Sequence, residues 1–223
     1  MTDGLEFNDD LRALITANLR RHPVQAQPLD DRRRAAVAFT LVNAGGVADI
    51  GNLPEQGRDQ KQAAFLLTTR SAALSSHASQ RAYPGGRVDA GETVEVAALR
   101  ELWEEVGLRL DPDRILGRLD DYPTRSGFVI TPIVVWGGSD VELVPNPAEV
   151  ARIHWIPLTE LLRDDAPLLD QIDESPEPVL RMPLGDDWFA APSAAIAYQF
   201  REVALLGRDT RVAHFEQPRF AWR

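Results

Sequence analysis

The hydrophobic positions of this chain follow two spacings, one typical of helices and the other of strands. Between Asp9 and Arg21, apolar side chains recur every three or four residues, which predicts an amphipathic helix that ends before Pro23. Four runs rich in apolar and β-branched residues have the length of strands. These predicted strands are Ala35–Val42, Ala63–Thr69, Phe128–Trp136 and Val150–Ile156.

Further helices are predicted from capping signals as well as from spacing. Thr93–Val106 has the marks of a helix, and Gly107 is placed to end it in the left-handed conformation. Ser193–Leu206 has a similar character, with Gly207 after it. The remaining predicted elements are a short helix, Leu158–Leu162, and a final strand, Arg211–Phe215.

Polar stretches with glycine and proline separate these elements and predict loops. Asn43–Gln60 predicts a surface excursion, Ser71–Ala82 has no clear period, and Tyr83–Gly86 is a strong turn signal. Asp164–Asp187 is rich in Asp, Glu and Pro, which predicts a mobile loop. Because the predicted strands surround one polar helix without a regular βαβ alternation, we expect a mixed α/β sandwich.

Net charge and composition narrow the classes of ligand and location. The 223-residue chain has a formal net charge of −10, which disfavours nucleic-acid binding, because phosphate backbones are held by clustered Lys and Arg. The chain has no cysteine, which excludes disulfides and thiolate chemistry. The first residues lack a signal-peptide pattern, and the longest apolar stretch is too short to span a bilayer. We therefore expect a cytoplasmic protein that does not bind membranes.

The helix Thr93–Val106 carries a cluster of glutamates. At about 100° per residue, Glu101, Glu104 and Glu105 lie within about 100° of arc on one face. Leu99, Leu102, Trp103 and Val106 lie on an opposite arc that we expect to pack on a sheet. A hard divalent cation would relieve the repulsion among the glutamates and would bridge an acidic protein to a phosphate substrate. The alternative is a solvated acidic helix face.

The residues around this helix form a motif with fixed spacing. That pattern is a glycine, five residues, a glutamate, seven residues, and then Arg-Glu-aliphatic-any-Glu-Glu-any-Gly-aliphatic. Every specified position matches, at Gly86, Glu92, Arg100, Glu101, Leu102, Glu104, Glu105, Gly107 and Leu108. From average residue usage, a chance match is on the order of 10⁻⁹ per starting position. The segment is therefore similar to the catalytic motif of Nudix hydrolases.

The Nudix resemblance implies a fold, a metal site and a reaction. The fold would be an α/β/α sandwich with a mixed sheet and a loop–helix–loop motif, and the reaction would be attack of water on a phosphorus of a diphosphate. The metal ligands for Mg²⁺ or Mn²⁺ would be Glu101, Glu104, Glu105 and the Gly86 carbonyl. The catalytic residues would be Glu101 as the favoured base, Glu104, and Arg100 paired with Glu92. For that pair, an exposed surface ion pair is the alternative. Glu149 is a further candidate acid or a plain surface glutamate.

A second resemblance covers roughly Arg34–Leu162. The run Leu66–Gly86 is similar to the signature that precedes this motif in coenzyme A pyrophosphohydrolases. The alternative is that the run only supports the helix from an adjoining strand and loop. Ser75 stands where an arginine is usual, Ser79 where a glycine is usual, and Tyr83 where a phenylalanine is usual. Because Ser75 removes a cation that could meet a substrate phosphate, other arginines become candidates. These candidate substrate-binding residues are Arg70, Arg81 and Arg125.

The two resemblances imply a Mg²⁺-dependent Nudix pyrophosphohydrolase that cleaves coenzyme A or its thioesters to 4′-phosphopantetheine and adenosine 3′,5′-bisphosphate. Two alternatives stay open: hydrolysis of another nucleoside diphosphate derivative, such as ADP-ribose or NADH, and a non-catalytic ligand-binding regulator with the same fold. Each of these three functions is compatible with a homodimer. We expect an N-terminal helical extension over residues 1–30, a Nudix domain over 31–165, and a C-terminal loop, helix and strand over 166–223. Trp188 and Trp222 are candidates for stacking on an adenine.

Overall fold

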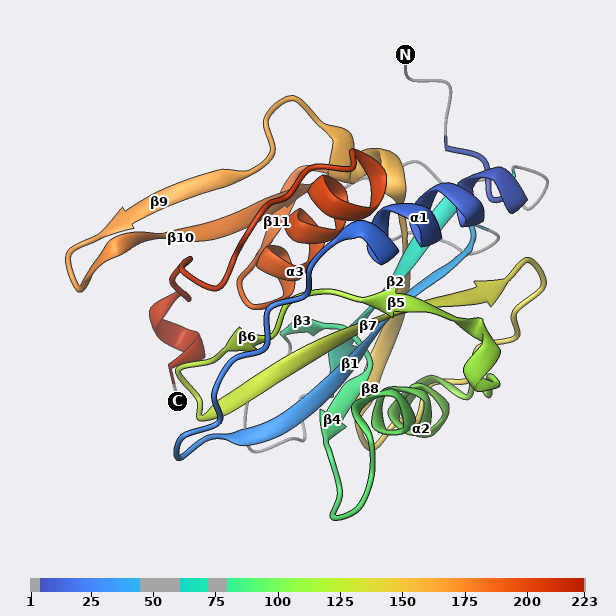
Figure 1. Ribbon diagram of the computed structural model, residues 1–223, viewed down its shortest axis with the longest axis horizontal. Coiled ribbons are helices and arrows are strands. Elements are labelled where there is room, and N and C mark those ends of the chain that lie inside the picture. The colour runs from blue at the N-terminus through green and yellow to red at the C-terminus, as the bar shows by residue number, and fades with distance from the viewer. Residues whose placement is uncertain (1–4, 45–60, 72–79, 223) are drawn as a thin grey trace.

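The computed structural model describes residues 5–44, 61–71 and 80–222 (Figure 1). The helices are α1 (Asp9–Arg21), α2 (Val94–Val106) and α3 (Ser193–Gln199), which continues as the π-helical stretch Phe200–Leu205. The strands are β1 (Arg33–Asn43), β2 (Ala63–Arg70), β3 (Arg81–Ala82), β4 (Gly85–Arg87), β5 (Ile115–Arg118), β6 (Tyr122–Pro123), β7 (Phe128–Gly138), β8 (Val150–Pro157), β9 (Leu168–Ile172), β10 (Ser175–Leu184) and β11 (Asp187–Ala190). Short 3-10 helices lie at Pro112–Arg114, Leu158–Leu162 and Arg219–Ala221.

The larger of the two sheets is mixed. Its eight strands follow the order β3-β2-β1-β7-β5, with β4 beside β1, β6 beside β7 and β8 beside β2. The long central strands β1 and β7 are parallel, with Ala35 opposite Ile130, and the other pairs are antiparallel. The smaller sheet has three strands in the order β11-β10-β9.

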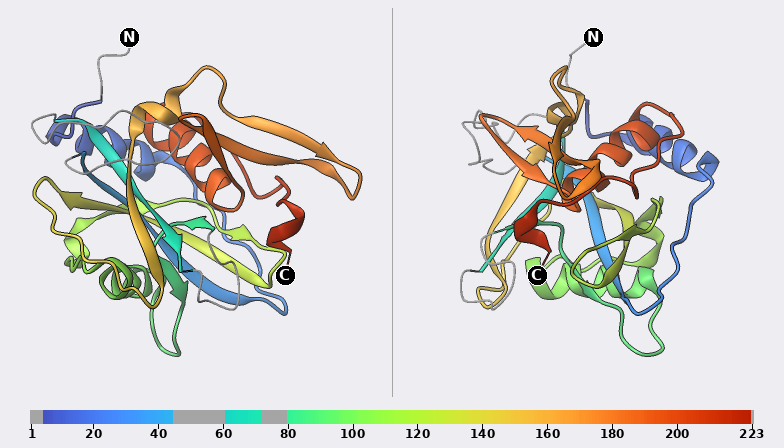
Figure 2. Two further views of the ribbon diagram at one scale, coloured as in Figure 1. Left: turned by 180° about the vertical axis from the view of Figure 1, so that it is seen from behind. Right: turned by 90° about the vertical axis from the view of Figure 1, so that its left-hand side faces the viewer.

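Both faces of the central strands are buried, which explains their continuous apolar runs. On β1, Ala36 and Ala38 belong to the core beneath α2, whereas Phe39 and Leu41 belong to the core beneath α1 and α3. This alternation follows from the two-residue period of a strand. Helix α2 covers one face of the sheet, and α1 and α3 cover the other (Figure 1, Figure 2). The protein is therefore an α/β/α sandwich, as the sequence predicted.

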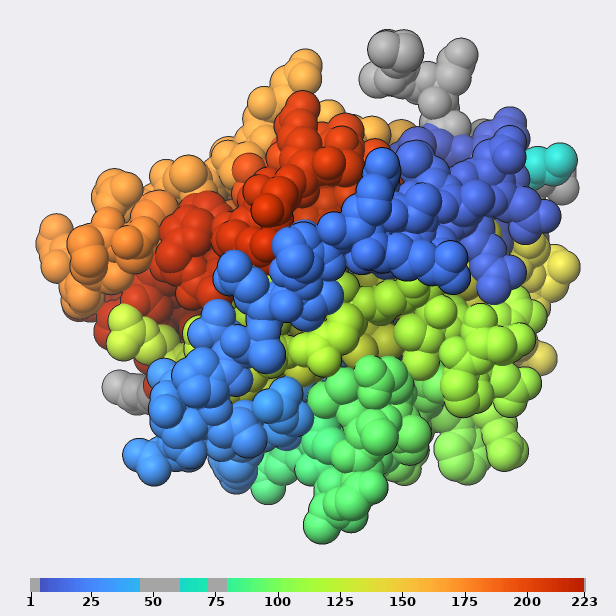
Figure 3. Space-filling model, in the orientation of Figure 1, coloured from blue at the N-terminus to red at the C-terminus, as the bar shows by residue number. Residues whose placement is uncertain are grey.

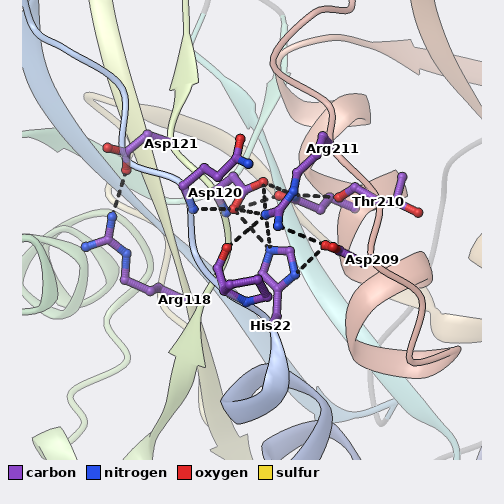
Figure 4. A network of polar contacts seen from close by, with 10 residues as sticks. His22, Arg118, Asp120, Asp121, Asp209, Thr210 and Arg211 are labelled. Atoms are coloured by element: carbon purple, nitrogen blue, oxygen red, sulfur yellow. Dashed lines mark hydrogen bonds and ion pairs between the residues drawn. The ribbon is translucent and has the colours of Figure 1, made fainter.

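A buried network around Asp120 joins the N-terminal and C-terminal parts of the chain (Figure 4). The donors to the Asp120 carboxylate are the Gln25 N–H at 2.8 Å, Gln199 Nε2 at 2.7 Å and Arg211 Nη1 at 2.9 Å. His22 Nε2 lies 3.0 Å from the same carboxylate. The segment between α1 and β1, which contributes Gln25, crosses the surface of the molecule (Figure 3). These contacts hold both ends of the chain onto the segment that links β5 to β6.

The stretch Asp164–Asp187, expected as a mobile loop, is instead largely β-structure. Strands β9 and β10 pair with Leu180 opposite Leu169, and β10 pairs with β11 with Met182 opposite Phe189. Leu180 and Met182 are fully buried in the core beneath α3. Burial of these alternate apolar residues outweighs the turn-forming character of the Asp, Glu and Pro residues around them.

The expected strand Arg211–Phe215 is also wrong. The Arg211 guanidinium is drawn into the Asp120 network, and the chain turns at Ala213. Only an isolated bridge between Val179 and Glu216 follows. The side-chain hydrogen bonds of this segment therefore replace a ladder of backbone pairs.

Some of the expected loops, and some positions that differ from the coenzyme A pyrophosphohydrolase signature, lie outside the described residues. Most of the loop Asn43–Gln60, and Ser75 and Ser79, lie outside the described residues, whereas Arg81–Ala82 forms strand β3 instead of loop. Tyr83 is buried, and its hydroxyl donates to the Ser193 carbonyl at 3.1 Å. None of the described helices has both the length and the apolar composition needed to cross a membrane.

Candidate active site

Helix α2 begins and ends where the sequence signals place it. Thr93 Oγ1 accepts a hydrogen bond from the Val96 N–H at 3.3 Å, as an N-cap residue does. Gly107 has a φ of 75°, and its N–H donates to the Trp103 carbonyl. A Cβ at Gly107 would also lie 3.2 Å from the Val144 carbonyl oxygen. Conformation and space therefore both favour glycine at this position.

The face of α2 that packs on the sheet includes Leu102 and Val106, as expected, but not Trp103. Its most buried apolar residues are Ala97, Ala98, Leu102 and Val106. The Trp103 residue is 52% exposed, and the Arg109 guanidinium carbon lies 5.4 Å from its ring centroid. The expectation that Trp103 packs on the sheet is wrong, because small alanines let α2 approach β1 closely along a stripe that excludes it.

Three carboxylates converge on the sheet side of α2. Glu101 and Glu105 project from the helix, and Glu149 comes from the loop before β8. One ligand atom from each residue lies within 4.8 Å of those of the other two. Burial raises the pKa of Glu105 to about 8, with Arg70 opposing the shift and the other two carboxylates adding to it. Burial also raises the pKa of Glu101, although a hydrogen bond from Arg100 opposes that shift.

Backbone contacts bring Glu149 to the helix. The Asn146 N–H donates to the Glu105 carbonyl at 2.8 Å, and the Val144 N–H donates to the Val106 carbonyl at 2.9 Å. These bonds satisfy carbonyls that a helix end leaves without intrahelical partners. The Ser71 N–H donates to the Glu149 carbonyl at 2.8 Å, which joins the loop to the end of β2. Glu149 was only a candidate in the sequence, where nothing in its neighbourhood distinguished it from a surface glutamate.

The two glycines of β4 let strand β1 approach on one side and the Glu101 carboxylate on the other. A Cβ at Gly85 would lie 2.5 Å from the Ala36 carbonyl oxygen of β1, and one at Gly86 would lie 2.2 Å from Glu101 Oε1. Gly86 pairs with Ala36 in an antiparallel ladder. The turn expected over Tyr83–Gly86 is therefore wrong at its second half, where the glycines form a strand between β1 and the Glu101 carboxylate.

Arg100 connects the remaining glutamates of the motif. Its Nε and Nη2 donate to the two oxygens of Glu92 at 2.9 Å and 3.1 Å, so the expected pair is present and bidentate. Its Nη1 donates to Glu101 at 2.8 Å and to Glu104 at 3.0 Å. Hydrogen bonding to Arg100 lowers the pKa of Glu92. Glu104 is exposed and forms an ion pair with Arg100. It does not belong to the cluster of three carboxylates.

A cleft of about 660 Å³ opens beside Gly86. Its lining includes Ala35 and Val37 on β1, Arg70 on β2, Arg81 on β3, Arg87 on β4, Phe128 and Ile130 on β7, Trp188 and Phe189 on β11, and Phe220 near the C-terminus. The cleft therefore lies between the large sheet and the C-terminal segments, next to the glycine that faces Glu101. Its volume is in the range of pockets that enclose a drug-sized ligand.

The three candidate substrate-binding arginines differ in their surroundings. Arg70 lines the cleft, and its Nη1 lies 4.0 Å from Glu105 Oε1. Arg81 also lines the cleft, but its Nη2 pairs with Asp187 Oδ2 at 2.5 Å. Arg125 is outside the cleft lining and forms an ion pair with Glu216. Of the three, Arg70 is the best placed between the carboxylates and the cleft.

Arg87 is a cation that the sequence reasoning missed. It lines the cleft, is exposed, and has its guanidinium carbon 5.7 Å from the Phe128 ring centroid. Within the described parts of the chain, no carboxylate pairs with it. The signal was its position directly after Gly86, where any side chain borders the site.

Known proteins similar to this chain share its motif and fold. A family model described as the NUDIX domain matches residues 51–179, more than half of the chain. An uncharacterized Nudix hydrolase, NudL, of Photorhabdus laumondii is 45% identical over 99 residues, which cover 44% of this chain and 53% of that protein. Nudix hydrolase 3 of Caenorhabditis elegans is 33% identical over 157 residues, which cover 69% of this chain and 59% of that protein.

The match to these two relatives therefore spans little more than half of their length. The NudL protein of Pectobacterium atrosepticum is 32% identical over 151 residues, which cover 67% of this chain and 70% of that protein. Among solved structures, a MutT/nudix family protein from Enterococcus faecalis superposes with a TM-score of 0.50 at 16% identity, over 84% of this chain and 66% of that chain. This last likeness concerns the fold alone.

Proposed function

This chain belongs to the Nudix hydrolase family, and from that premise we propose that it is a divalent-metal-dependent pyrophosphohydrolase of a nucleoside diphosphate derivative. The observation that carries the proposal is the convergence of Glu101, Glu105 and Glu149. They lie beside Gly86, at the edge of the cleft. An acidic cluster next to a cleft with arginines on its walls suits a substrate whose anionic groups reach a metal ion.

The donor set fits Mg²⁺ or Mn²⁺. Three carboxylates with ligand atoms within 4.8 Å of one another repel, and the raised pKa of Glu105 reflects burial without enough positive charge nearby. Mg²⁺ prefers a few carboxylates together with waters and substrate phosphates. The residues that would hold it are Glu101, Glu105, Glu149 and the Gly86 carbonyl, with Glu104 as a further ligand. When bound, such an ion polarises a phosphoryl oxygen and offsets negative charge that develops there.

Glu101 is the proposed general base. Its Oε1 accepts the hydrogen bond from Arg100 Nη1, which leaves Oε2 to accept the proton of the attacking water. The water oxygen forms a bond to one phosphorus, the bridging P–O bond breaks, and the second phosphate leaves. A raised pKa makes the Glu101 carboxylate a better proton acceptor near neutral pH. Arg100, held on its other side by Glu92, orients this carboxylate.

Coenzyme A is the proposed substrate. The similarity of Leu66–Gly86 to the signature of coenzyme A pyrophosphohydrolases supports this choice. The structure adds Arg87 to Arg70 as cations on the cleft wall, and a charge-assisted hydrogen bond from either would hold a phosphate remote from the cleaved bond. Arg81 contributes less, because Asp187 already occupies its guanidinium.

A substrate panel tests the proposal. Purified protein is incubated with coenzyme A, ADP-ribose, NADH or dinucleoside polyphosphates, with Mg²⁺, Mn²⁺ or EDTA, and the products are identified by mass. We expect 4′-phosphopantetheine and adenosine 3′,5′-bisphosphate from coenzyme A, no turnover in EDTA, and recovery on adding metal. Full turnover without metal would contradict the mechanism, and faster turnover of ADP-ribose or NADH would replace coenzyme A as the substrate.

A second experiment tests the recognition of the 3′-phosphate. Arg70→Ala and Arg87→Ala are compared with Arg125→Ala, whose guanidinium lies outside the cleft lining. Loss of a charge-assisted hydrogen bond should raise KM for coenzyme A by about tenfold or more relative to dephospho-coenzyme A. If none of the variants changes this ratio, the 3′-phosphate is not recognised by these arginines, and a broader nucleoside diphosphate specificity follows.

A further inference from the structure

Large aromatic side chains stand exposed on the C-terminal wall of the cleft. Trp188 on β11 is 38% exposed, and Phe220 in the last 3-10 helix is 55% exposed. Both line the cleft that opens beside Gly86. Neither belongs to the catalytic motif, and burial in the core explains neither. Aromatic surface inside a concave site is suited to a flat, apolar part of a ligand.

The Trp188 ring is fixed before any ligand binds. The Arg181 guanidinium carbon lies 4.5 Å from the ring centroid, a cation–π contact that covers one face of the indole. Arg181 is itself held by Asp170, with Nη2 to Oδ1 at 2.7 Å. The main chain is held as well, because the Trp188 carbonyl accepts a hydrogen bond from Arg81 Nη1 at 2.8 Å. A ring anchored in this way loses little conformational freedom when a ligand stacks on it.

The second candidate for stacking, Trp222, is placed differently. Its Nε1 donates to the Gln217 carbonyl at 2.8 Å, and the Arg125 guanidinium carbon lies 5.2 Å from its ring centroid. Trp222 is not among the residues that line the cleft. Of the two tryptophans that the sequence offered, only Trp188 therefore borders the site.

We propose that Trp188 is the platform on which the planar base of the substrate stacks, with Arg181 fixed on the opposite face of the indole. The inference rests on the proposed function and deepens it, because it places the nucleoside against β11 and the diphosphate towards Gly86. The three-stranded sheet β9–β10–β11, and not the catalytic motif, then selects substrates that carry a base.

Kinetics of matched tryptophan variants test this inference. Trp188→Ala and Trp188→Phe are compared with Trp103→Ala, which removes another exposed tryptophan, one that does not line the cleft. With coenzyme A as substrate, Trp188→Ala should raise KM by about tenfold or more while kcat changes little, since base–aromatic stacking is lost. Trp188→Phe should restore most of the affinity. KM for 5-phosphoribosyl 1-diphosphate, which has no base, should not change in either variant.

Binding measurements separate this inference from the proposed activity. Adenosine monophosphate, titrated in the presence of Mg²⁺, should quench tryptophan fluorescence in the wild-type protein, and ribose 5-phosphate should not. Trp188→Phe should lose the quenching and retain calorimetric binding, whereas Trp188→Ala should lose both. Binding with this pattern in a protein that hydrolyses nothing would support the platform and contradict the proposed function. Hydrolysis with an unchanged KM in Trp188→Ala, or equal losses in Trp103→Ala, would overturn the platform alone, and absence of both binding and hydrolysis would overturn both.

Discussion

Two carboxylates are almost equally inaccessible to solvent, and yet their pKa values are shifted in opposite directions. Glu105 in the candidate active site is 3% exposed, and Asp120 in the network between the chain ends is 2% exposed. Burial raises the pKa of Glu105 to about 8. Burial alone would also raise the pKa of Asp120, but hydrogen bonds from the Gln25 N–H, Arg211 and Gln199 bring it below its usual value.

The difference lies in what each carboxylate faces. Asp120 faces donors from three distant segments, so ionisation is compensated and the contacts stabilise the fold. Glu105 faces Glu101 and Glu149, with one arginine nitrogen 4.0 Å away. The surroundings of Glu105 therefore hold too little positive charge to compensate its ionisation, and a bound cation would supply that charge. Equal burial therefore stabilises the fold at Asp120 and, as we propose, prepares Glu105 to bind a metal ion.

The largest effect is expected from Glu105→Gln. Removing a carboxylate that we propose as a metal ligand should lower kcat by roughly 10²–10⁴-fold, as loss of a key charge-stabilising group does. Without metal, the free energy of unfolding near pH 7 should rise, because the amide is neutral in both states, whereas Glu105 has to take up a proton when the chain folds. Steady-state kinetics and urea denaturation in EDTA measure the two effects. Glu95→Gln, in the first turn of the same helix, is the control; full activity of Glu105→Gln would identify Glu105 as structural.

Asp120→Asn should lower the stability of the protein and leave its activity nearly unchanged. Replacing one member of a buried, hydrogen-bonded charge network should lower the free energy of unfolding by about 3 kcal/mol, because Arg211 and His22 lose their charged partner. The kcat per folded molecule should change by less than about twofold, since the network lies outside the cleft. Urea denaturation and activity at a temperature where the variant is folded provide the comparison. A stable but inactive variant would show that the network acts on catalysis.

Gly86→Ala should disturb the active site with a smaller loss. The added Cβ would lie 2.2 Å from Glu101 Oε1, so the carboxylate has to move away from its place in the cluster. We expect kcat to fall by about tenfold or more, with a small change in unfolding free energy, because the end of a side chain is displaced and not the backbone. Gly91→Ala has open space around its Cβ and a φ of 84° that strains an alanine, so it controls for a loss of stability in this loop without contact with Glu101. Equal activities of the two variants would contradict the close approach.

The pH dependence of stability gives a further contrast between the two carboxylates. In the metal-free protein, folded Glu105 keeps its proton up to a pH of about 8, whereas the unfolded group loses it near 4.5. Between these values the folded state binds more protons, so the stability contributed by Glu105 falls as pH rises, by at most about 1.4 kcal/mol per pH unit. For Asp120, whose pKa is lowered from 3.8, the contribution is present above that value and lost below it. Urea denaturation in EDTA between pH 4.5 and 8 should show that the unfolding free energy of the wild-type protein falls as pH rises. Glu105→Gln should reduce this slope, and Asp120→Asn should leave it unchanged. Identical slopes in all three proteins would contradict the raised pKa of Glu105.

The elements with a clear period or cap were predictable from the sequence. Helix α1 has the bounds predicted for it, Asp9–Arg21, and α2 ends at Gly107, where a left-handed residue was required. The central strands were recognised because both of their faces are buried and their sequences are continuously apolar. The pair of Arg100 with Glu92 followed from the motif spacing.

The rest depended on contacts that only the folded chain makes. The sheet β9–β10–β11 was missed because acidic residues and prolines obscure the alternation that buries Leu180 and Met182. Glu149 joins the carboxylates through backbone bonds between its loop and α2, which no local pattern encodes. The exposure of Trp103 follows from how closely two alanines bring α2 to the sheet, and a helical wheel contains no such distance.

The separation of the two sheets bears on how such enzymes diverge. Strands β9, β10 and β11 form a ladder of their own, distinct from the eight-stranded sheet that carries β1, β4 and the carboxylates. Because none of the described strands in Leu168–Ala190 pairs with β1 or β4, we expect replacements in this stretch that keep its buried residues to preserve the register of β1 and β4. A chimera that receives this stretch from a relative should inherit the donor's preference for a nucleobase and keep the recipient's chemistry. On the proposed platform, the preference for a base and the catalytic carboxylates belong to separate stretches of the chain, and each stretch can change without the other.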